Sequence, residues 1–126
     1  MNMAKVVAIA VVVVLVLGIL SVGTAYLVSS GKQKRVIEDI EQAKALLENG
    51  EDEAALVLLK KTAAKYPDSP VAAETLFLLG KTMYEQEEES EKASAVFEKL
   101  LEKYPNSAWS RQADYYKTVT LLDDRP

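Results

Sequence analysis

Carboxylates and lysines are the main side chains of this 126-residue sequence that could do chemistry, since it has no cysteine and no histidine. Their absence removes cysteine nucleophiles, disulfides, thiolate zinc sites and the Ser-His-Asp triad. The densest acidic group, Glu85–Glu91, reads EQEEESE. A solvated turn between helices is its simplest account; weak Ca²⁺ binding or a basic partner is the alternative, although EF-hand spacing is absent. No motif gathers serine, lysine and carboxylates together, so we expect no catalytic residues, no enzyme activity, no metal and no cofactor.

Charge is distributed unevenly along the chain. There are 19 acidic and 15 basic residues, a net charge of −4, and every acidic residue lies at Glu38 or beyond. An acidic domain without a basic patch argues against nucleic acid as a partner. We divide the sequence into an anchor at 1–30, a basic juxtamembrane linker at 31–35, a helical domain at 36–122 and a tail at 123–126.

Residues 6–30 carry no charge and are mostly apolar. About 20 such residues suffice for a helix to cross a bilayer, so the run predicts one transmembrane helix with the lipid bilayer as its partner. The alternative, a cleaved secretory signal, has a shorter apolar region of about 7–15 residues. No cysteine follows the run, which excludes lipoprotein processing. Small residues at three- and four-residue steps predict a packing face for another membrane helix: Gly18, Ser21, Ala25 and Ser29.

Helical spacing of apolar residues runs through the remainder of the chain, and no β alternation interrupts it. It predicts an all-α domain with helices near 33–48, 52–66, 70–86, 90–104 and 108–122. Asn49-Gly50, Pro67, Pro70 and Pro105 separate the helical patterns, because proline cannot continue a helix interior. Ser69 and Ser107 stand just before the third and fifth helices as candidate N-caps.

An internal repeat is the most informative feature of this domain. Lys65-Tyr66-Pro67-Asp68-Ser69-Pro70 recurs as Lys103-Tyr104-Pro105-Asn106-Ser107-Ala108, 38 residues on (65 to 103). A period in this range with two helices per unit is typical of an α-solenoid. The expected architecture is a short solenoid of two helix pairs plus a capping helix.

The repeat resembles the tetratricopeptide family, whose pattern of about 34 residues contains a Leu-Gly pair, an aromatic, then Ala, Phe and Pro. Met83 departs from it at the aromatic position, and the Gly80-to-Ala93 step is one residue longer than standard. The Lys-Tyr-Pro-Asp/Asn-Ser segment is similar to the bacterial envelope subgroup that includes the Tol-Pal-associated cell-division coordinator and the outer-membrane assembly lipoprotein. The matching structural positions are Leu79, Gly80, Ala93, Phe97, Pro67 and Pro105.

The resemblance implies a partner-binding groove along the first helix of each repeat, a site for a peptide or helix of another protein. Carried over by position, the groove residues are Glu74, Phe77, Lys81, Tyr84, Glu85, Gln112 and Tyr115. For Phe77 the sequence supports a second interpretation equally well, namely a residue of the hydrophobic core. Trp109, Tyr115, Leu121 and Leu122 make the last helix apolar, which indicates either packing onto Leu100 and Phe97 or docking of a partner or a second copy.

Two functions therefore stay open at this point. One is a membrane-anchored adaptor that binds another envelope protein through its groove; the other is an accessory subunit of a larger membrane complex, held mainly by its span. The resemblance implies a single-pass protein of the bacterial inner membrane with a periplasmic domain. The charges flanking the span, Lys5 before it and Lys32, Lys34 and Arg35 after it, favour the opposite orientation by the positive-inside rule.

Overall fold

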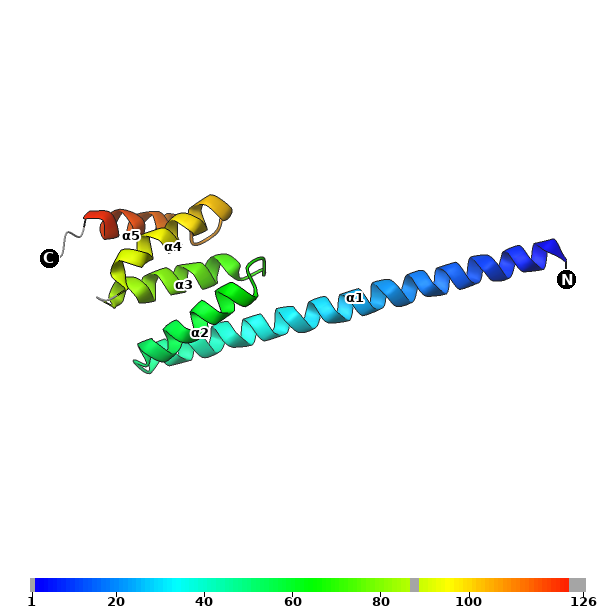
Figure 1. The fold of residues 1–126 in the computed structure, drawn as a ribbon, viewed down its shortest axis with the longest axis horizontal. Coiled ribbons are helices and arrows are strands. Elements are labelled where there is room, and N and C mark those ends of the chain that lie inside the picture. Colours follow the sequence, from blue (N-terminus) through cyan, green and yellow to red (C-terminus); the bar gives the residue numbers. More distant parts are fainter. Residues whose placement is uncertain (1, 87–88, 123–126) are drawn as a thin grey trace. The chain divides into compact units, whose positions relative to one another are not determined.

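The computed structural model describes residues 2–86 and 89–122, and within them the side chains of 18–30 and Ser90 are not described. Five helices follow one another in this part of the chain: α1 (Met3–Glu48), α2 (Asp52–Lys65), α3 (Ala72–Glu85), α4 (Ser90–Lys103) and α5 (Ser110–Leu122) (Figure 1). No strand occurs among the described residues. The all-α prediction and the bounds of the last four helices agree closely with the structure.

The chain divides into two compact units, Met1–Lys34 and Arg35–Pro126. Helix α1 continues without a break through residues 31–35, so the first helix of the repeat domain does not begin afresh near residue 33. In the first unit, the described apolar side chains from Val6 to Leu17 are exposed.

The predicted transmembrane helix is wrong on the evidence of the described residues. None of their helices is both long enough and apolar enough to cross a membrane. Gly18, Ser21, Ala25 and Ser29, the expected packing face, have side chains that lie outside the described residues.

The turn between α1 and α2 is a glycine-dependent helix stop. Gly50 has a φ of 74°, a left-handed conformation that glycine adopts without a Cβ clash. Its N–H donates to Leu47 O at 3.1 Å, and Glu51 N–H donates to Leu46 O at 2.8 Å. This pair of bonds satisfies the last carbonyls of α1 in a Schellman arrangement and reverses the chain into α2.

The core of the second unit lies between successive helices. It comprises buried apolar side chains from α1 to α5: Ile40, Ala43, Leu56, Leu59, Leu76, Phe77, Leu79, Met83, Ala93, Phe97, Leu100 and Ala113. Helix α3 packs on both α2 and α4, and α4 packs on α5. Each helix therefore buries its apolar stripe against sequence neighbours, as a solenoid requires.

Candidate functional site

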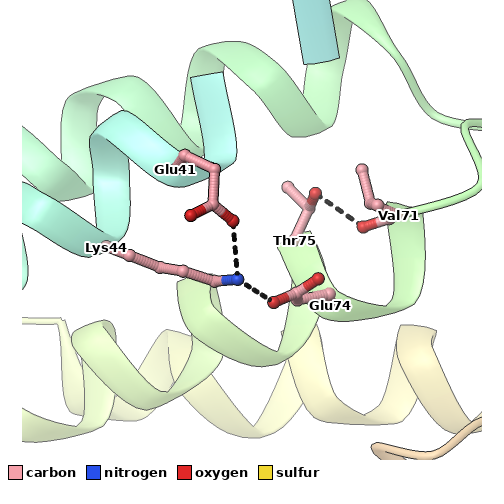
Figure 2. A network of polar contacts seen from close by, with 5 residues as sticks. All are labelled: Glu41, Lys44, Val71, Glu74 and Thr75. Atoms are coloured by element: carbon pink, nitrogen blue, oxygen red, sulfur yellow. Dashed lines mark hydrogen bonds and ion pairs between the residues drawn. The ribbon is translucent and has the colours of Figure 1, made fainter. Parts of the chain in front are cut away.

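The first helices of successive repeats are α1 from residue 35 onward, α3 and α5; we call the surface that they share the first-helix face. A charged network joins α1 to α3 on it (Figure 2). Lys44 Nζ lies 2.6 Å from Glu74 Oε1 and 3.1 Å from Glu41 Oε1. The hydrogen bond to Glu74, followed by that to Glu41, raises the pKa of Lys44 above its ordinary value. One ammonium group thus holds carboxylates of two helices together.

Helix α3 keeps its first turn ordered beside this network. Thr75 is buried, and its hydroxyl donates to Val71 O at 2.8 Å (Figure 2). That bond satisfies a polar group that would be costly to bury alone. Glu74, the residue before Thr75 in the chain, has only 18% of its side chain exposed. Its carboxylate is therefore held in a defined position at the border of the face.

Aromatic rings join α3 to α5. Phe77 stacks on Trp109 with ring centroids 5.0 Å apart, and it meets Tyr116 edge-on at 5.9 Å. Tyr84 also meets Tyr116 edge-on, with ring centroids 5.7 Å apart. Phe77 is only 6% exposed, so its position is that of a core residue, the alternative that the sequence left open. Tyr84 is half-buried and borders the surface.

The other expected groove residues lie at the surface of α3 and α5. Lys81 Nζ and Glu85 Oε1 are 3.9 Å apart along one turn of α3. Gln112 is exposed, and Tyr115 is 65% exposed with its ring against Tyr116. These surface positions of α3 and α5 carry a carboxylate, an ammonium group, an amide and a phenol ring.

Sequence reasoning missed the contribution of α1 to this face. Ile37 is 47% exposed, and Glu41 and Lys44 form the network with α3. A signal for them existed: Ala43, fully buried, takes in α1 the place that Gly80 takes in α3, 37 residues on (43 to 80). The same offset of 37 residues matches Ile37 to Glu74 and Lys44 to Lys81, so it would have identified both as residues of this face.

The residues that match the tetratricopeptide pattern lie where their side-chain size fits the packing of the helices. Ala93 is fully buried and Leu79 is 6% exposed. Phe97 is fully buried and lies against Gly80, where an added Cβ would be 2.7 Å from the ring. Pro67 and Pro105 each come two residues after a helix ends.

The repeated Lys-Tyr-Pro segment makes a contact that spans the two repeats. Lys103 Nζ donates to Pro67 O at 2.8 Å and lies 2.7 Å from Asp68 Oδ1, and Tyr104 OH donates to Pro67 O at 3.0 Å. The hydrogen bond to Asp68 raises the pKa of Lys103. The end of α4 is thereby fastened to the turn before α3.

The acidic run that follows α3 shows ion pairs in its described part. Glu89 Oε2 lies 3.4 Å from the ammonium groups of Lys60 and Lys92. Glu87 and Glu88 lie outside the described residues. Within the residues that are described, no cluster of three or more acidic side chains could hold a metal ion.

Antiparallel helix pairs with a recurring turn and a recurring inter-repeat contact define an all-α helical-repeat protein of the tetratricopeptide type. The chain belongs to the outer membrane lipoprotein family YfiO, whose model matches residues 22–124. No curated protein matches the chain, and no solved structure does. The envelope placement rests on this family. The single-pass placement in the inner membrane is not supported, because no helix of the described residues could cross a membrane.

Proposed function

We propose that the chain is a non-catalytic adaptor of the bacterial envelope, and that its first-helix face binds a segment of another envelope protein. Membership of the outer membrane lipoprotein family supports the envelope setting. The observation that carries the proposal is the Lys44–Glu74 ion pair, which holds α1 and α3 side by side with their charged groups at the surface. A face fixed in advance loses less conformational entropy when it binds.

The groove residues of the proposal are those with surface area to offer. Lys81 and Glu85 supply charges of both signs, Tyr84 and Tyr115 supply rings, and Gln112 supplies an amide. Rings and charged groups at the centre of an interface carry much of its binding energy when they are desolvated. Glu74 borders this set, while Phe77 supports Tyr84 indirectly through Tyr116.

Site-specific photocrosslinking in living cells tests the proposal. A photoreactive phenylalanine analogue replaces Lys81 or Tyr115 on the first-helix face, and the crosslinked adducts are identified by mass spectrometry. The matched control is Val57, which is 68% exposed on α2, the second helix of the first pair. We expect one discrete envelope protein in the adducts of Lys81 and Tyr115 and its absence from those of Val57.

A charge reversal then connects the adduct to binding. We expect Lys81→Glu to reduce the adduct formed from Tyr115 by several-fold, since it places a second negative charge beside Glu85. Equal adducts at Val57 and at the face, or an adduct indifferent to Lys81→Glu, would show that the first-helix face is not the binding surface.

A further inference from the structure

The chain contains its own template for what covers a first helix. Helix α4 packs on α3, and its Phe97 lies against Gly80 and beside Phe77, with the two phenyl centroids 6.3 Å apart. At its end, Lys103 and Tyr104 donate to Pro67 O, the carbonyl of the preceding turn. A second helix therefore covers a first helix along its length and also fastens to the turn before it.

Helix α5 repeats α3 with the 38-residue offset, but no described helix covers it in the same way. Four positions that are buried in α3, Leu76, Phe77, Gly80 and Met83, become Asp114, Tyr115, Thr118 and Leu121. All four are exposed, Tyr115 by 65% and Leu121 by 64%. By contrast, two other matching pairs correspond in burial, since Ala72 and Thr75 are buried and so are Ser110 and Ala113. We call the surface formed by these four residues and Leu122 the open face of α5; within the described residues no second helix covers it as α4 covers α3.

The turn before α5 is open in the corresponding way. Pro105-Asn106 repeats Pro67-Asp68, yet within the described part of the chain no side chain donates to Pro105 O or to Asn106. An open hollow lies here, lined in part by Pro105, Asn106 and Arg111. The acceptors that hold Lys103 and Tyr104 in the first turn are thus available in the second.

We propose that the open face of α5 and the Pro105–Asn106 turn together bind one amphipathic helix of a partner protein, antiparallel to α5 and ending in a basic residue followed by tyrosine. The basic group and the phenol bond Asn106 and Pro105 O, as Lys103 and Tyr104 bond Asp68 and Pro67 O. Opposite Thr118 the partner has a small side chain, because even a Cβ at the matching Gly80 would meet the Phe97 ring. A second basic group faces Asp114.

A second copy of this chain is not the occupant that fits. The two helices that end in Lys-Tyr, α2 and α4, already bury their apolar stripes within their own chain, with Leu59 and Leu100 fully buried. Neither could cover another copy's α5 without leaving its own place. The proposed surface also differs from the first-helix face, apart from Tyr115 at their border, so the two proposals can fail separately.

A synthetic peptide with the α4 sequence of residues 90–106, carrying alanine in place of Phe97, serves as the probe. Its binding to the purified full chain is measured by fluorescence anisotropy. We expect saturable binding that weakens about tenfold when the peptide's lysine and tyrosine at 103 and 104 are replaced by methionine and phenylalanine. The peptide that keeps Phe97 should bind more weakly than the alanine peptide.

A substitution that should increase affinity, Asn106→Asp, tests the proposal more specifically than a loss of binding does. Asn106→Asp restores the carboxylate that Asp68 provides in the first turn, and charge-assisted hydrogen bonds are stronger than neutral ones. We expect Asn106→Asp to tighten binding of the lysine-bearing peptide several-fold and to leave the peptide without that lysine unchanged. Leu121→Asp should weaken both peptides.

Three results would overturn the proposal. One is the lack of saturable binding to a chain whose helical content is intact by circular dichroism. Another is tighter binding of the Phe97 peptide, insensitive to Asn106→Asp, which would mean that the peptide displaces α4. The third is a dimer in sedimentation equilibrium that Leu121→Asp dissociates, which would make a second copy the occupant of this face.

Discussion

Gly80 and Phe97 meet so closely that the second repeat permits no side chain at Gly80: a Cβ there would lie 2.7 Å from Phe97 Cε1 and 2.8 Å from Cζ. Phe97 has no room to retreat, since it is fully buried and stacks on Tyr116 with centroids 5.6 Å apart. This contact brings α3 and α4 together and also sets the place of the ring that supports α5.

Gly80→Ala should therefore destabilise the domain. Overpacking a full core costs about 1–3 kcal/mol, against a gain of up to about 1 kcal/mol in helix propensity. Urea unfolding followed by circular dichroism measures the net loss. Gly31→Ala is the matched control, because a Cβ at Gly31 meets nothing within 4 Å. A Gly80→Ala protein as stable as wild type would contradict the tight contact, and Phe97→Leu in the same chain should recover part of the loss.

Phe77 and Tyr115 occupy matching positions in α3 and α5 but differ in burial, 6% against 65% exposed. Truncating a buried phenylalanine costs about 3–5 kcal/mol, whereas an exposed substitution changes stability by about 0.5 kcal/mol or less. We expect Phe77→Ala to unfold at much lower urea than Tyr115→Ala. Trp109, the only tryptophan in the chain, stacks on Phe77 and reports the loss of packing by its fluorescence. Equal midpoints for the two variants would contradict a core role for Phe77.

Lys103 and Lys65 form a second matched pair, 38 residues apart (65 to 103). Both lie over the ring of the following tyrosine, but only Lys103 also reaches Pro67 O and Asp68. Lys103→Met should lower the midpoint of urea unfolding, and Lys65→Met should leave it nearly unchanged. Adding Asp68→Asn to Lys103→Met should cause little further loss, since the ion pair is already gone. Equal effects of the two lysine substitutions would show that the inter-repeat contact contributes nothing.

Lys44 predicts a pH dependence at the alkaline end. Glu74, then Glu41, raises its pKa above 10.5 in the folded chain, so folding favours the protonated form. The stabilisation is complete below pH 10.5 and is lost as the pH rises through the folded pKa. Its size should be below about 1 kcal/mol, because the pair is partly exposed to solvent. The difference in unfolding free energy between wild type and Lys44→Met should shrink above that pH; a difference that grows with pH would contradict the assignment.

Local signals in the sequence correctly predicted the existence of the helices, but they were misleading about where some helices begin. Asn49-Gly50 and the prolines marked the turns correctly, because their backbone preferences act within a few residues. Ser69 and Ser107 looked alike as N-caps. Neither directly precedes its helix, since α3 begins at Ala72 and α5 at Ser110. Ser107 accepts from Trp109 N–H at 3.3 Å, whereas the Ser69 hydroxyl is buried without a described hydrogen bond. Ser110 supports Ser107 through a 2.8 Å hydroxyl contact, and Ala72 has no hydroxyl to do the same.

The sequence by itself determined the all-α class, the repeat and the small residues at the crossing of α3 and α4, since period, turn chemistry and side-chain size are local properties. It could not decide which face each residue would occupy once the helices packed. Phe77 and Tyr115 are both aromatic and take the same place in the repeat, yet Phe77 is covered by Trp109 and Tyr116 and Tyr115 is exposed. The Lys44–Glu74 bridge likewise joins residues 30 positions apart (44 to 74) through the packing of α1 on α3. Burial and ion pairing depend on neighbours distant in sequence, and only the tertiary structure supplies those.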